Sequence, residues 1–297
     1  MARDLKLTIG AVNITTHPHS PANYKALFKA AFGLKLGIHL AGQRHAVLGS
    51  VINADEADDA TPLCGEVLCY TKIDSNGNWL NLSNFEILDD DEKKREIRLP
   101  KDLMPDTLAI QYVFYPKTHL LFFEVYHRRS KMSPQTMGKF LIGLFSSNSI
   151  QEQFGEVNVT VIPSHESLDQ ILRMPRITRL NISIRRPNAD DQEELEKYVL
   201  QTMTDQGVIK MDTEYTSGRG GTLKPDKAIR DLAFIAARNG LVEAQGEDTE
   251  GNSAKESTND HPFLDTTMFN EKTQTLRQAI MDLSAQMMRS IKQIIPR

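Results

Sequence analysis

Cysteine is scarce in this sequence: only Cys64 and Cys69 occur among 297 residues. They lie five positions apart in a segment, TPLCGEVLCY, that reads as a single strand. Because side chains alternate between the two faces of a strand, the two thiols are expected to point in opposite directions and not to form a disulfide. Two cysteines without further ligands nearby also do not make a zinc site. We therefore expect two unreactive thiols in a reducing compartment.

Long apolar runs and an excess of positive charge are absent as well. No apolar run approaches the ~20 residues of a membrane-spanning helix, and residues 1–10 contain no apolar core of a signal peptide. The formal net charge of −4 argues against a surface that coats nucleic acid everywhere, although it is compatible with a local basic face. We expect a cytoplasmic protein without membrane insertion.

Motifs of common enzyme classes are missing too. None of the eight histidines has the spacing of an HExxH zinc site, and no serine lies in GxSxG. We therefore predict no catalytic residue, no metal and no cofactor. One segment leaves an alternative open, because the glycine-rich loop Gly218–Gly221 precedes a predicted helix and could present backbone N–H groups to a phosphate. A nuclease or a nucleotide-processing enzyme is the alternative that this loop suggests.

Strand-forming segments dominate the first part of the chain. Thr107–Arg128 predicts the clearest hairpin, since two aromatic and β-branched runs flank a tight turn at 116–118. Later segments alternate between strand and helix, from a predicted helix over Ser133–Phe154 to a long one over Thr266–Ile295. We predict an α+β fold with two domains: a strand-rich N-terminal domain (1–130) and an alternating α/β domain that ends in the C-terminal helix (131–297).

Arginine is concentrated in residues 173–186, RMPRITRLNISIRR, which contain five arginines and no acidic residue. Leu180, Ile182 and Ile184 alternate there with polar residues, which predicts a strand with one apolar face and one arginine-rich face. Guanidinium groups form paired hydrogen bonds with phosphates and carboxylates alike. The face could therefore contact nucleic acid, or it could form salt bridges with the acidic residues of a predicted helix at Asp190–Glu196.

The nucleic-acid hypothesis extends this face to neighbouring segments. Tyr126 or His127, at the end of the predicted hairpin, could stack on a base. The sequence does not distinguish DNA from RNA. The candidate nucleic-acid-binding residues are Arg176, Arg179, Arg185 and Arg186 in or beside the strand, helped by Arg128, Arg129 and Arg219.

The predicted C-terminal helix carries one continuous apolar stripe. Its residues are Leu276, Ile280, Leu283, Met287 and Ile291, at spacings of three or four. Such a stripe must be covered by the same chain or by a second one. We predict that it mediates self-association into a homodimer, with packing onto its own domain as the alternative.

Several segments occur in a characteristic order: the hairpin arm HLLFFEVYHR, a helix with KFLIGLF, a strand ending in IPS, the strand ITRLNISIRR, a charged hairpin, and the C-terminal helix. In this order, residues 105–297 resemble the RexA and KwaB type of bacterial phage-defence proteins. The resemblance implies a cytoplasmic bacterial protein that binds DNA without strong sequence preference, dimerises, and could act with a second defence protein. We therefore expect a nucleic-acid-binding sensor or regulator, with an enzyme or a structural subunit docking through its last helix as alternatives.

Overall fold

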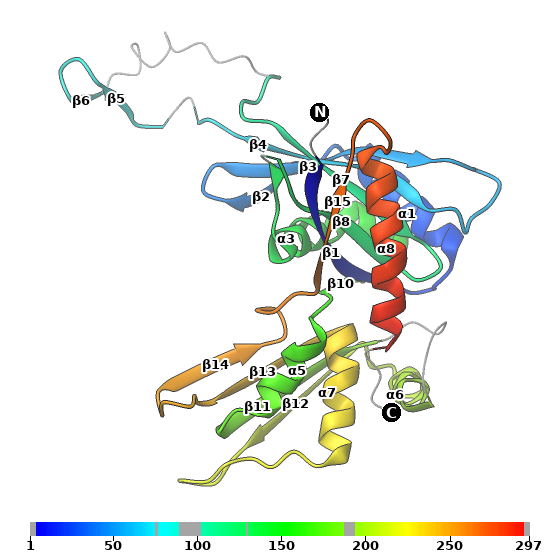
Figure 1. Cartoon of the computed structure of the whole chain (residues 1–297), viewed down its shortest axis with the longest axis vertical. Helices are drawn as coiled ribbons and strands as arrows, with labels where there is room; N and C mark the ends of the chain where they lie inside the picture. Colours follow the sequence, from blue (N-terminus) through cyan, green and yellow to red (C-terminus); the bar gives the residue numbers. More distant parts are fainter. Residues whose placement is uncertain (1–3, 75–76, 89–101, 129, 187–193, 294–297) are drawn as a thin grey trace.

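The computed structural model describes residues 4–74, 77–88, 102–128, 130–186 and 194–293. It has an α+β fold, as predicted, with two large sheets that lie one above the other along the long axis of the molecule (Figure 1). No helix among these residues is long and apolar enough to cross a membrane.

The first unit is a curled antiparallel sheet (Figure 1). The predicted hairpin forms its centre as two adjacent strands, β7 (Leu108–Tyr115) and β8 (Leu120–His127). The sheet order is β10 (Val157–Val161), β1 (Leu5–Thr16), β8 (Leu120–His127), β7 (Leu108–Tyr115), β4 (Leu63–Thr71), β3 (Arg44–Asn53) and β2 (Ile38–Ala41), and β15 (Leu264–Phe269) and β9 (Ser130–Lys131) pair with β1 and β8.

Helices cover both faces of this sheet. One face packs against α1 (Pro21–Gly33), α3 (Pro134–Phe145) and α4 (Asn148–Phe154), and the other packs against α8 (Leu276–Gln293). Phe28 of α1 stacks on Phe114 of β7 with ring centroids 4.7 Å apart. The helix predicted over 133–154 is divided in two, because the chain leaves the helical conformation at Ser147. Cys64 and Cys69 are free and buried on opposite faces, as predicted.

The C-terminal segment differs from the single helix predicted over 266–295. Its first part, β15, pairs along β1, as its β-branched pair Thr266-Thr267 favours. The helix α8 begins only at Leu276, where the Thr275 hydroxyl accepts the N–H of Gln278. The apolar stripe of α8 is buried against its own sheet, with Ile280 and Met287 fully buried. The stripe is therefore not a free surface for a second chain, and self-association by another surface stays a prediction.

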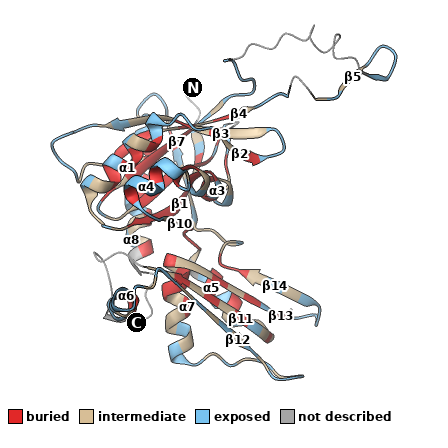
Figure 2. Ribbon diagram, turned by 180° about the vertical axis from the view of Figure 1, so that it is seen from behind, coloured by how far each residue is buried: buried red, intermediate tan, exposed pale blue. Residues whose placement is uncertain are grey.

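The second unit is a four-stranded antiparallel sheet with helices on one face. Its order is β12 (Lys210–Thr216), β11 (Arg176–Arg185), β13 (Gly240–Glu247) and β14 (Ser253–Ser257). Apolar residues of α5 (His165–Leu172), α6 (Glu194–Asp205) and α7 (Lys227–Asn239) pack against the buried face of β11 and β13. Figure 2 colours the ribbon by burial, and buried residues recur along β11 and β13. The opposite face of the sheet carries intermediate and exposed side chains except for the buried Ser257 at the end of β14, and we call it the open face.

Beyond residue 130, where the sequence suggested a domain boundary, two segments pack with the first sheet. Residues 134–161 belong to the first unit, because α3 and α4 fill its core and β10 joins its sheet. Residues 264–293 return to the same unit as β15 and α8, so the second unit, 165–257, is an insertion between two parts of the first. A short hairpin of β5 (Trp79–Asn81) and β6 (Glu86–Leu88) extends away from both units (Figure 1).

Candidate functional site

The arginine-rich strand is β11, and its pattern is as predicted with one irregularity. Leu180, Ile182 and Ile184 are buried under the helices. A β-bulge at Thr178 lets Ile177 reach the same buried face, although it lies three positions before Leu180. Arg176, Arg179 and Arg185 therefore project from the open face.

Each of these three arginines has a carboxylate partner. Arg176 pairs with Glu247 of β13, Arg179 Nε lies 3.6 Å from Glu214 of β12, and Arg185 lies 2.8 Å from Glu156. The salt-bridge alternative thus describes their contacts, and the acids come from neighbouring strands and from Glu156 just before β10. Residues 190–193 of the predicted acidic helix lie outside the described residues. Because these pairs are one-third to one-half exposed, each contributes only ~0–1 kcal/mol. A phosphate can replace such a carboxylate at little cost.

Of the other four predicted arginines, the three that the structure describes lie apart from the open face. Arg186 donates to the Thr204 hydroxyl at 3.0 Å, and its buried Nε has no partner among the described residues. Arg128 pairs with Glu271 on the first unit, and Arg219 is exposed in the loop between β12 and α7. Arg129 lies outside the described residues. The structure therefore brings three of the seven predicted arginines, Arg176, Arg179 and Arg185, together on the open face.

The glycine-rich loop does not present a free helix N-terminus. The first turn of α7 is capped by its own Asp226, whose carboxylate accepts the N–H of Ile229 at 2.9 Å. The segment that follows the loop is hydrogen-bonded to the start of β11, because the Leu223 N–H donates to the Ile177 carbonyl. A carboxylate at this position occupies the place of a phosphate and repels one.

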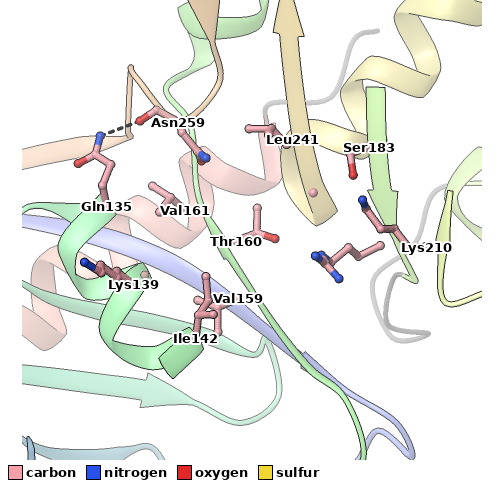
Figure 3. Close-up of a pocket in the computed structure, with 13 residues that line it drawn as sticks. Gln135, Lys139, Ile142, Val159, Thr160, Val161, Ser183, Lys210, Leu241 and Asn259 are labelled. Atoms are coloured by element: carbon pink, nitrogen blue, oxygen red, sulfur yellow. Dashed lines mark hydrogen bonds between the residues drawn. The ribbon is translucent and has the colours of Figure 1, made fainter. Parts of the chain in front are cut away.

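A cleft of about 430 Å³ lies where the open face meets the first unit (Figure 3). Figure 3 shows Lys139 of α3 and Lys210 of β12 on opposite sides of it, with Thr160 of β10 between them. Of the 13 residues that line the cleft, three are basic and none is acidic. The lining residues are Gln135, Gly138, Lys139, Ile142, Val159, Thr160, Val161, Ser183, Arg185, Lys210, Gly240, Leu241 and Asn259.

Two of the basic residues stand side by side. Arg185 and Lys210 are direct partners across β11 and β12. Like charges in this position repel each other, and here each has its own counter-ion: Glu156 for Arg185 and Asp212, at 2.6 Å, for Lys210. Hydrogen bonds from Lys210 and Ser183 lower the pKa of Asp212, which keeps this carboxylate charged at neutral pH. The third cation, Lys139, donates to the Leu40 carbonyl.

A second hollow of about 350 Å³ on the open face has the opposite character. Asp212, Glu214 and Glu243 line it, against the single cation Lys210. A polyanion is therefore favoured at the cleft end of the open face and disfavoured across its middle.

The sequence did not reveal the residues that complete the cleft. The sequence does not single out Lys210, because its position beside Arg185 follows from the register of β11 and β12. Lys139 and Gln135 lie on the exposed side of α3, and they meet the second unit only because α3 belongs to the first. Among the described residues, no group of three or more His, Cys, Asp or Glu side chains is placed to hold a metal ion.

A partly buried polar network connects the two units beside this region. His119, in the turn between β7 and β8, has its Nδ1 2.7 Å from Asn13 Oδ1. Asn13 in turn donates to the Arg238 carbonyl near the end of α7. Burial, together with the nearby His19 and Arg238, lowers the pKa of His119 to about 3. His119 is therefore neutral and donates its Nδ1–H to Asn13.

Acid is expected to destabilise the protein through His119. Its pKa is lower in the folded than in the unfolded chain, so the unfolded chain takes up the proton first and stability falls as the pH drops from about 6.5 towards 3. The loss should approach roughly 1 kcal/mol per pH unit. Urea unfolding of the wild type and of His119→Asn at pH 7 and pH 5 measures it. Asparagine tolerates the positive φ of 47° at this position, so an equal loss in both proteins would contradict the assignment.

The comparison with known proteins adds a family but no activity. The profile of a domain of unknown function, DUF4747, matches residues 5–285, which include both sheets, the cleft and most of α8. No curated protein matches the chain. The chain belongs to the DUF4747 family.

Proposed function

We propose that this protein binds nucleic acid through phosphate contacts at the cleft, with Arg185 and Lys210 as the principal contacts. The observation that carries the proposal is the pairing of these two cations across β11 and β12, at the rim of a cleft with no acidic residue among its described lining. An arginine fork beside a lysine is a frequent arrangement for holding a phosphate. Arg179 and Arg176 lie farther along β11, beyond the acidic middle of the open face, and are the weaker candidates for further contacts.

Such a site binds by charge and reads little sequence. Phosphate contacts release counter-ions, so the affinity falls steeply with salt, while sequence discrimination requires contacts to base edges. With two to four phosphate contacts, the logarithm of the binding constant should fall with the logarithm of salt concentration at a slope between about −2 and −4.

The cellular setting that we propose is bacterial anti-phage defence, as a sensor or regulator. This part rests on the resemblance of residues 105–297 to the RexA and KwaB type. Binding without strong sequence preference suits a protein that responds to foreign DNA of many sequences.

Fluorescence anisotropy with labelled 20-nucleotide DNA and RNA, single- and double-stranded, tests the binding proposal. We expect binding at 50 mM salt that weakens about 10- to 150-fold at 200 mM, as two to four phosphate contacts require. Absence of binding to all four probes at 50 mM salt would refute it.

A further inference from the structure

The first sheet has an uncovered end beyond the first turn of α3. The bulge at Val125 turns Tyr126 to this face, whereas His127 turns to the other face and packs on Phe269 at 5.4 Å. Tyr126 is 44% exposed although it lies in a central strand. The ring of Tyr126 therefore presents an apolar surface to solvent at this end of the sheet.

Lysines flank this ring. Tyr126 is the direct cross-strand partner of Lys131 on β9 and of Thr8 on β1. Lys6 lies two residues before Thr8 on the same face, which places it diagonally from Tyr126, ~7–8 Å away. Both lysines are exposed, and neither forms an ion pair in the part of the chain that the structure describes. In this they differ from the arginines of the open face, which all have carboxylate partners.

The face adjoins the cleft through α3. Pro134, the first residue of α3, lies over Gly10, where an added Cβ would be 3.1 Å from the proline ring. Gln135, the next residue, lines the cleft and donates to the Asn259 carbonyl at 2.7 Å. A strand of nucleic acid held at the cleft can therefore continue around the start of α3 onto Tyr126.

We propose that this face binds an unpaired base of single-stranded nucleic acid, which stacks on Tyr126 while Lys6 and Lys131 contact the flanking phosphates. The inference rests on the proposed function and names its substrate class. Stacking on an exposed aromatic ring between cations is how proteins hold single strands without reading their sequence. The bases of a duplex are stacked on each other and do not offer a free face.

Anisotropy with labelled dT20 and with a 20-base-pair duplex tests the inference on folded variants. Tyr126→Ala should weaken dT20 binding about 5- to 150-fold, since a stacked base contributes ~1–3 kcal/mol, and should leave duplex binding unchanged. Tyr126→Phe, which keeps the ring, should bind dT20 within about twofold of the wild type.

Three results overturn the inference in distinguishable ways. Unchanged dT20 affinity in Tyr126→Ala, alongside weaker binding when the cleft residues are replaced, removes the stacking face and leaves the proposed function standing. Absence of wild-type binding to both probes removes the proposed function and this inference with it. An equal loss for dT20 and duplex in Tyr126→Ala also contradicts base stacking.

Discussion

Replacing Arg185 and Lys210 together by glutamine is expected to weaken nucleic-acid binding at least about tenfold at 50 mM salt and to reduce the salt slope by about 2. Each phosphate contact accounts for about 0.9 of that slope on duplex DNA, and the two residues are the adjacent cations of the cleft. Glutamine keeps most of each side chain and leaves Glu156 and Asp212 half-exposed to water, so the fold should tolerate the change. Anisotropy at several salt concentrations measures both quantities.

A second variant with the same change in net charge serves as the control. Lys29 and Arg173 also form exposed ion pairs, with Glu56 and Asp169, but they lie away from the cleft and the open face. Lys29→Gln with Arg173→Gln should bind nucleic acid almost as the wild type does. If both double variants lose affinity equally, binding depends on overall charge and not on the cleft.

Replacing Leu283 by aspartate is expected to destabilise the chain by about 3–5 kcal/mol. Leu283 is 3% exposed in the core between α8 and the first sheet, where an aspartate leaves a cavity and an unpaired buried charge. Since a domain is stable by only ~5–15 kcal/mol, this loss should lower the urea midpoint strongly or prevent folding.

Ala285→Asp introduces the same residue on the exposed side of the same helix and should change stability by less than about 1 kcal/mol. The two variants together separate packing within the chain from self-association. A Leu283→Asp protein that keeps wild-type stability and only changes from dimer to monomer by light scattering would contradict the packing of α8 on its own sheet.

Much of the fold follows from local pattern. The aromatic and β-branched arms around residues 116–118 form a hairpin wherever they lie, so β7 and β8 could be predicted. The conformation of Thr266–Phe269 could not be predicted in this way, because its apolar residues also suit the start of a helix. The segment forms a strand because it pairs with β1. The division of the chain into units could not be predicted, because it depends on which sheet residues 134–161 and 264–293 join.

The site was predictable only in part, for a similar reason. Alternation along β11 placed Arg179 and Arg185 on one face, since alternation is a property of the strand itself. Their carboxylate partners Glu214 and Glu156 lie on other elements. The ion pairs and the net charge of the open face could therefore be determined only from the tertiary structure. Lys210 likewise belongs to the site because of the register between β11 and β12, which is a property of the tertiary structure.

The most direct test of the account is to map where a bound single strand touches the protein. An oligonucleotide that carries 4-thiouridine can be crosslinked by light to the wild-type protein under low-salt conditions where it binds, and the attached peptides identified by mass spectrometry. We predict crosslinks in peptides of β11 and β12 around Arg185 and Lys210, and in the peptide that contains Tyr126. Crosslinks confined to the β5–β6 hairpin, or to α5 and α7 on the covered face of the second sheet, would contradict the account.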